Sequence, residues 1–128
     1  MHILESALYS EDLEGARGFY VGVLGLPEIS FDPDRHLFLR CDRGVLILFK
    51  ASRTRIPDSV VPPHGCEGPG HLAFAASVEE IEAWRSRLEK AGVPIIEEID
   101  WPNGARSIYF TDPTGNVLEF ATPNLWGF

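Results

Sequence analysis

Hydrophobic and polar residues alternate over Ile3–Tyr9, which is the pattern of a half-buried β-strand. A helical pattern follows, in which Asp12 is suited to cap the N-terminus and Gly25 to end the helix. Apolar residues recur at helical spacing between them: Leu13, Ala16, Tyr20, Val23 and Leu24. Strand-like runs then lie at 28–31, 36–41 and 45–49, with a hairpin turn at 42–44. The first half is therefore predicted to be βαβββ.

The second half repeats this order. His71–Ala75 reads as a strand, and Ser77 with Glu80 forms the S-x-x-E capping box that starts a helix. Its apolar stripe consists of Ile81, Trp84, Leu88 and Ala91, and Gly92 ends it. Strands are predicted at 95–99, 106–111 and 116–121, with a turn at 112–115. The pattern predicts one module at 1–51, a Pro- and Gly-rich linker at 52–70, a second module at 71–122 and an apolar tail at 123–128.

Strand alternation places one ionisable side chain beside small ones on the face opposite the bulky apolar residues. In the first strand this is Glu5, next to Ala7. His71 and Glu119 have the same setting, beside Ala73 and Ala121. Each residue taken alone is readily explained as a solvated or hydrogen-bonded side chain. Because the three fall at matching places in the repeated module, we favour a shared metal or ligand site.

The repeat and its turn residues resemble a known family. Asp12-Leu13, Phe19-Tyr20 and Leu24-Gly25-Leu26, followed by Tyr109–Asn116 and then Leu118-Glu119, are similar to the vicinal oxygen chelate superfamily. That group includes glyoxalase I, extradiol dioxygenases, methylmalonyl-CoA epimerase, fosfomycin-resistance thiol transferases and bleomycin-binding proteins. The resemblance implies an α+β fold in which two βαβββ modules form an open, curled mixed β-sheet half-barrel around a metal cavity.

The resemblance implies up to four metal ligands, two from each module. Glu5 matches the first position, His71 the third and Glu119 the fourth. Laying 44–49 over 115–120 puts Leu48 at the second position, where it cannot bind a metal. A three-ligand site for one divalent ion results, similar to the thiol transferases and dioxygenases, with Mn²⁺, Fe²⁺, Zn²⁺, Ni²⁺ and Co²⁺ all open. Glu5 is either a ligand or a general base.

Further candidates line the same expected cavity. Ser107 and Tyr109 face it by strand parity, where similar thiol transferases place oxyanion contacts, so Tyr109 joins Glu5 and Glu119 as a catalytic candidate. Arg40 is expected to hold an anionic substrate. His64, in a Pro-rich loop, is expected to be a mobile surface histidine.

The composition of the chain limits the classes of partner that we expect. A formal net charge of −8 argues against nucleic acid, and no apolar run reaches the length of a membrane span. The N-terminus does not have the residue order of a signal peptide, and the two cysteines lack metal-ligand spacing, which favours a cytoplasmic protein with reduced thiols. Open sheet edges and an apolar tail favour a homodimer.

Two functions remain open. The first is a metal-dependent enzyme acting on a small oxygen-rich molecule through a chelated oxyanion, as a lyase, isomerase, transferase or dioxygenase. The alternative is a non-catalytic protein that sequesters a small molecule or drug. Retention of Glu5, His71 and Glu119 favours the enzyme.

Overall fold

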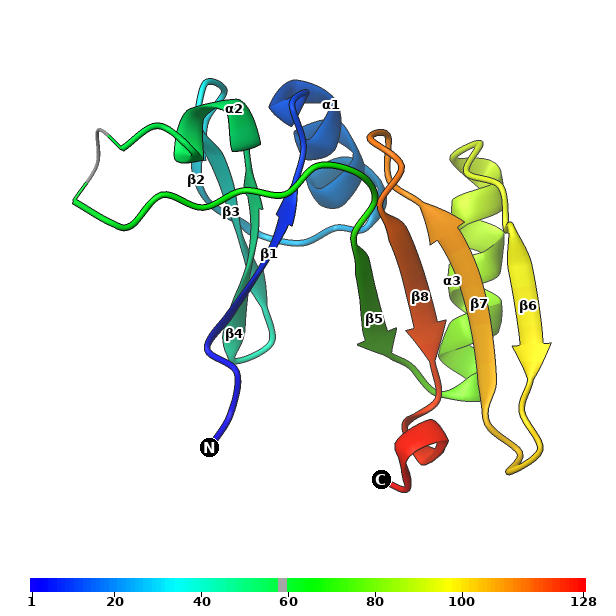
Figure 1. Cartoon of the computed structure of the whole chain (residues 1–128). Coiled ribbons are helices and arrows are strands. Elements are labelled where there is room, and N and C mark those ends of the chain that lie inside the picture. Colours follow the sequence, from blue (N-terminus) through cyan, green and yellow to red (C-terminus); the bar gives the residue numbers. More distant parts are fainter. Residues whose placement is uncertain (58–59) are drawn as a thin grey trace. The chain divides into compact units, whose positions relative to one another are not determined.

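The computed structural model describes residues 1–57 and 60–128. These form two compact units, Met1–Gly70 and His71–Phe128, each described by itself below (Figure 1). Among the described residues, no helix has both the length and the apolar character that crossing a membrane requires.

The first unit is a four-stranded sheet in the order β1-β4-β3-β2. β1 is parallel to β4, and the other pairs are antiparallel. Its elements in chain order are β1 (Glu5–Tyr9), α1 (Leu13–Arg17), the π-helical segment η1 (Gly18–Val23), β2 (Glu28–Asp32), β3 (His36–Cys41), β4 (Gly44–Phe49) and α2 (Ala51–Thr54). The short helix α2 lies at the start of the predicted linker and was not expected from the pattern.

The predicted helix of the first half begins as expected and then widens. Asp12 accepts a hydrogen bond from the backbone N–H of Gly15 at 2.9 Å, which caps α1. From Gly18 the helix has π geometry, and the Leu24 N–H donates to the carbonyl oxygen of Phe19. The adjacent residues Phe19 and Tyr20 are both buried in this segment, and the apolar spacing does not predict its π geometry.

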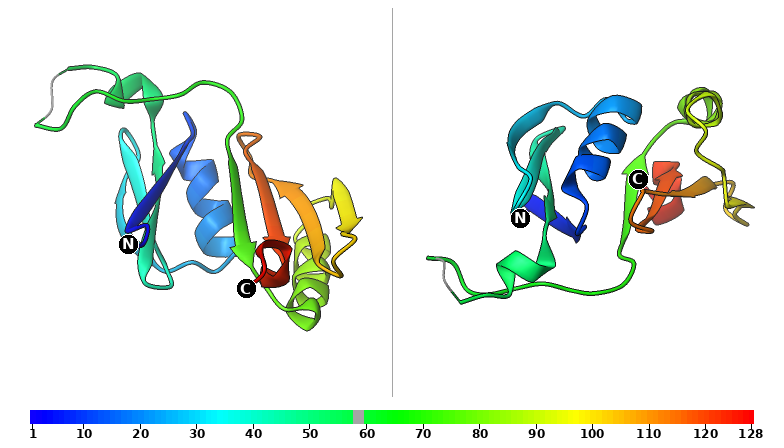
Figure 2. Two further views of the ribbon diagram at one scale, coloured as in Figure 1. Left: turned by 60° about the horizontal axis from the view of Figure 1, so that its bottom comes forward. Right: turned by 90° about the horizontal axis from the view of Figure 1, so that it is seen from above.

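The second unit repeats the topology, with strand order β5-β8-β7-β6 (Figure 2). Its elements are β5 (His71–Ala75), α3 (Val78–Lys90), β6 (Glu97–Asp100), β7 (Arg106–Thr111), β8 (Val117–Ala121) and the 3₁₀ segment η2 (Pro123–Trp126). The Ser77–Glu80 capping box is present, as predicted. Two open, mixed sheets carrying helices confirm the predicted α+β class.

One face of each sheet is the hydrophobic core. In the first unit Leu8, Leu48 and Leu37 lie side by side across three strands and are almost fully buried. In the second, Phe74, Phe120 and Ile108 form an equivalent row, and the Phe120 ring stacks on Trp84 of α3 at 4.6 Å between centroids. Because side chains alternate along a strand, the residues between these rows are on the opposite, open face.

A buried aspartate closes the turn before β8. One carboxylate oxygen of Asp112, Oδ1, accepts the backbone N–H groups of Thr114, Gly115 and Asn116 at 2.9–3.0 Å. The other, Oδ2, accepts the side-chain amide of Asn116 at 2.8 Å. Gly115 has a φ of 100°, a backbone conformation that residues other than glycine rarely adopt. This network fixes the register in which β8 leaves the turn.

Asp112→Ala removes the acceptor of these bonds, of which the two from Asn116 are buried and those from Thr114 and Gly115 partly buried. We expect a loss of about 2 to 4 kcal/mol in the free energy of unfolding, measured by urea denaturation. Asp42→Asn in the exposed turn between β3 and β4 is the matched control, since Asp42 is exposed and asparagine tolerates its φ of 49°. Equal stability of Asp112→Ala and the wild type would show that the turn does not depend on the carboxylate.

Homodimerisation stays a prediction, which we base on the edge strands and the exposed apolar tail. Within their own sheets β1, β2, β5 and β6 are edge strands, and the tail exposes Trp126 and Phe128 at 78% and 92%. We expect light scattering to give twice the 14.2 kDa chain mass at micromolar concentration. A Trp126→Ser, Phe128→Ser double variant should dissociate more readily, and a wild-type monomer throughout this range contradicts the prediction.

Candidate functional site

Glu119 is a buried acid on the open face of the second sheet. It lies at the middle of β8, in register with Ala73 of β5 and Tyr109 of β7. Its neighbours Leu118 and Phe120 point into the core, so alternation directs the carboxylate to the other face. The Glu119 side chain is nevertheless only 5% exposed. Burying a carboxylate is costly unless a cation or hydrogen-bond donors compensate it.

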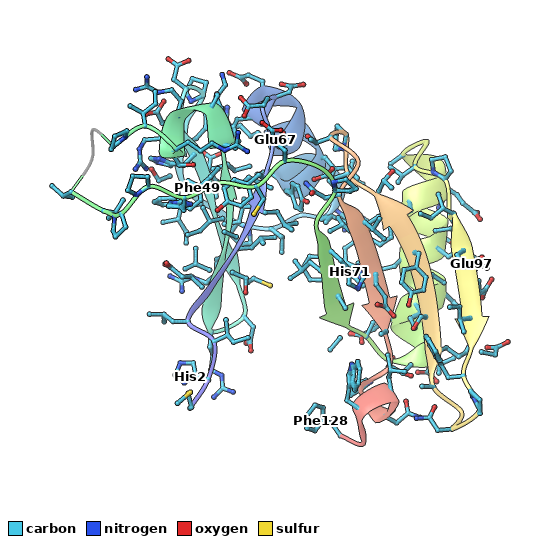
Figure 3. The ribbon with its side chains drawn as sticks, viewed as in Figure 1. His2, Phe49, Glu67, His71, Glu97 and Phe128 are labelled. Atoms are coloured by element: carbon cyan, nitrogen blue, oxygen red, sulfur yellow. The ribbon has the colours of Figure 1, made fainter. Side chains whose placement is uncertain are left out.

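His71 supplies the nearest partner. It is the first residue of β5 (Figure 3), and its Nδ1 donates a hydrogen bond to the carbonyl oxygen of Val117 at 3.0 Å. This bond orients the ring, and its other nitrogen, Nε2, lies 3.4 Å from Oε2 of Glu119. In the tautomer with Nε2 unprotonated, two electron-pair donors face each other, an arrangement that a cation between them stabilises.

The other oxygen of the carboxylate is the one that lacks compensation. Glu119 Oε1 is buried and has no hydrogen-bond partner. Buried polar atoms without a partner are rare in folded proteins and call for a specific explanation. Donor atoms held at about 2.1 Å from one ion, with angles of about 90° to 109°, lie about 3.0 to 3.4 Å apart. The separation of 3.4 Å between Nε2 and Oε2 fits this range, so the pair suits a divalent metal.

Tyr109 presents a hydroxyl group beside this pair. Its ring lies 6.2 Å from that of His71, inclined by 25°. Burial raises the pKa of Tyr109, and interaction with the Glu119 carboxylate raises it further. The phenol therefore stays protonated near neutral pH and acts as a hydrogen-bond donor rather than as a base.

Ser107, the other hydroxyl predicted on this face, is fully buried. Its Oγ accepts a hydrogen bond from the indole N–H of Trp101 at 2.9 Å. In this structure Ser107 orients Trp101, and its contribution to substrate binding stays a prediction.

The remaining predicted site residues belong to the first unit. Glu5 begins β1 and Arg40 lies on β3, and both are exposed on either side of Val45 in one register row. In neither unit taken alone do three histidine, cysteine, aspartate or glutamate side chains of the described residues gather around one point. His71 and Glu119 thus lie together as a pair, their role as metal ligands is a proposal, and the roles of Glu5 and Arg40 stay predictions.

The assignment of the second ligand position to Leu48 is wrong. In the structure Glu119 lies beside Ala73 on β5, and the residue in the same place beside Ala7 on β1 is Ile47. Aligning the halves on the glycines Gly44 and Gly115 shifted the strand by one residue, because the turn spans 42–43 in the first half and 112–116 in the second. Leu48 instead points into the core. Ile47 cannot bind a metal either, so the three-ligand expectation is unchanged.

The expectation for His64 is also corrected. Its ring packs against Phe49 at 4.8 Å between centroids, and its Nδ1 is 2.8 Å from the Tyr9 hydroxyl. A loop histidine held in this way is not a mobile surface group. The spacing of apolar residues predicts neither contact, since His64 lies 55 positions from Tyr9 in the chain and belongs to an irregular segment.

Comparison with known proteins gives consistent matches. A crystal structure of lactoylglutathione lyase from Agrobacterium tumefaciens superposes with a TM-score of 0.96 at 38% identity, covering 99% of this chain and 97% of that one. A glyoxalase/bleomycin resistance protein/dioxygenase from Nocardioides has a TM-score of 0.76 at 28% identity, covering 95% of this chain and 83% of that one.

Metallothiol transferase FosB of Bacillus licheniformis is 33% identical over 57 residues. That match spans 44% of this chain and 37% of the FosB chain, so it covers little more than a third of the curated relative. The family model of the Glyoxalase/Bleomycin resistance protein/Dioxygenase superfamily matches residues 2–120. The repeated βαβββ topology, the open sheets and this near-complete match show that the chain belongs to the Glyoxalase/Bleomycin resistance protein/Dioxygenase superfamily.

Proposed function

We propose that the protein is a divalent-metal-dependent enzyme that acts on a small oxygen-rich molecule. The observation that carries the proposal is the buried Glu119 carboxylate, which has one oxygen without a partner and the other facing Nε2 of His71 at 3.4 Å. A carboxylate and an imidazole in this arrangement are ligands for a divalent ion. Superfamily membership supports the same conclusion.

The residues divide into ligands and a donor. His71 and Glu119 bind the ion from the second module, and Glu5 completes the set from a first module, as a third ligand or as a general base. Tyr109 donates a hydrogen bond to an oxygen of the substrate as negative charge develops there. The ion, when bound, acts as a Lewis acid on adjacent substrate oxygens. Ile47 leaves the second family position without a donor, which would keep coordination sites for the substrate.

The named relatives favour a reaction that involves a thiol. One is called a lactoylglutathione lyase and the other a metallothiol transferase, so both names refer to sulfur-containing small molecules. We therefore place lyase and thiol-transfer chemistry ahead of oxygenation for this chain. The rival function is metal-independent sequestration of a small molecule, and it makes the opposite prediction in the experiment below.

Adding the correct ion should raise the melting temperature of the wild type. A ligand that binds only the folded state stabilises it by about 2.7 kcal/mol at 100 times its dissociation constant. His71→Ala and Glu119→Gln should respond little across a panel of Mn²⁺, Fe²⁺, Co²⁺, Ni²⁺ and Zn²⁺. Glu89→Gln, which neutralises an exposed acid on α3, is the control and should respond like the wild type. Equal shifts in all four proteins would reject the site and favour the sequestering protein.

In the absence of metal, we expect wild type no longer to be more stable toward urea than Glu119→Gln. Glu119→Gln keeps the size of the side chain but removes a buried charge whose Oε1 has no partner. We expect metal-free Glu119→Gln to unfold at the same urea concentration as metal-free wild type or at a higher one, at about pH 8, where a free imidazole is neutral. A loss of more than about 1 kcal/mol, the scale of an ordinary hydrogen bond, would indicate that Glu119 has a purely structural role.

A further inference from the structure

A second group of side chains lies on the open face of the first sheet, and the proposed metal chemistry does not use it. It surrounds Phe49 of β4 (Figure 3). The Tyr9 ring lies 6.4 Å from it and the Phe38 ring 6.1 Å, the latter edge-on. His36 stacks on Phe38 at 4.0 Å. We call this set, with His64 and Arg35, the Phe49 cluster.

The core of the unit does not need these rings. Leu8, Leu37 and Leu48 already fill the other face of the sheet and are almost fully buried. The rings of the Phe49 cluster, by contrast, are all partly exposed. Aromatic side chains gathered on an exposed face are typical of a binding surface.

His64 contributes a hydrogen-bond donor. Its backbone N–H donates to the carbonyl oxygen of Thr54 at 3.0 Å, which holds the segment after α2 near the sheet. The Tyr9 hydroxyl and Nδ1 of His64 lie 2.8 Å apart and share a hydrogen bond, which holds the His64 ring in place. In the tautomer in which Nδ1 accepts from the phenol, the ring proton is on Nε2, which is then an N–H donor.

Arg35 contributes a positive charge. It lies in the turn between β2 and β3, and its guanidinium carbon is 5.9 Å from the centroid of the Phe49 ring. Its carbonyl oxygen accepts the Lys50 N–H at 3.0 Å, which ties the turn to the end of β4. Over residues 1–57 and 60–128 no carboxylate forms an ion pair with Arg35. Burial lowers the pKa of His36, with Asp32 opposing and Arg35 adding to the effect, so His36 contributes a neutral ring.

We propose that the Phe49 cluster binds a planar organic anion, namely a carboxylate on an aromatic or conjugated skeleton. The skeleton packs on the rings of Phe49 and Phe38, and the carboxylate interacts with the Arg35 guanidinium and the His64 Nε2–H. Charge complementarity selects this ligand, because Arg35, which has no acidic partner among residues 1–57 and 60–128, and the His64 ring flank the same Phe49 ring in a chain of net charge −8. The proposal does not rest on the metal site.

Isothermal titration calorimetry with three small-molecule probes tests the proposed binding. Cinnamate is planar and anionic, cinnamamide is its neutral counterpart, and cyclohexanecarboxylate is an anion without a planar skeleton. We expect cinnamate to bind at least about tenfold more tightly than either probe. Cinnamamide lacks the charge-assisted contact, and cyclohexanecarboxylate lacks the planar skeleton that packs on the rings. Equal affinity for cinnamate and cinnamamide would overturn the role of the charge, and equal affinity for the two anions would overturn that of the rings.

Variants locate the binding. Arg35→Gln and His64→Gln should each weaken cinnamate by about tenfold and leave cinnamamide unchanged, whereas Phe49→Leu should weaken both. Arg43→Gln is the control, since that side chain is 94% exposed in the turn between β3 and β4. Glu119→Gln should bind cinnamate like the wild type. If Glu119→Gln weakens cinnamate and Arg35→Gln does not, the anion binds in the second unit and the proposal is wrong.

Discussion

The alternation of side chains along β8 is the constraint on which the candidate metal site depends. Leu118 and Phe120 must enter the core, so Glu119 between them must leave it. The cost of holding that carboxylate out of water falls on a strand that cannot rotate without exposing two large apolar side chains. The turn built on Asp112 sets the register, and the parallel pairing with β5 brings His71 to the same place.

Much of this arrangement can be predicted from the sequence, because the spacing of apolar residues and the residues that begin or end helices and turns are local signals. The repeated βαβββ order, the Ser77 capping box and the glycines that end the helices are all legible in short windows. Small discrepancies arise where tertiary packing decides. The pattern cannot show that the first helix takes π geometry after Arg17, since a π turn has no propensity signature of its own. Likewise, β6 begins at Glu97 rather than Ile95.

The same distinction between local signals and tertiary packing applies to the candidate sites. Parity alone brings His71, Glu119 and Tyr109 to one face, and the structure adds their separations and the unpartnered oxygen. Parity also produced the error at Leu48, because it was propagated through turns of unequal length, and a shift of one residue exchanges the two faces of a strand. In the Phe49 cluster, alternation brings the strand-borne rings to one face, but Arg35 and His64 could not be foreseen, since they reach it from a turn and an irregular segment.

The pairing of β5 with β8 also has a kinetic consequence. His71 and the carbonyl group that orients it are 46 positions apart in the chain, with α3 and two strands between them. The pair is therefore assembled only when the first and last strands of the module have come together, a long-range step that forms late when local contacts lead. An ion held there would do little to speed folding but would slow unfolding, since its contacts are absent until the module is closed. In such a protein, bound metal extends the lifetime of the native state more than it aids its formation.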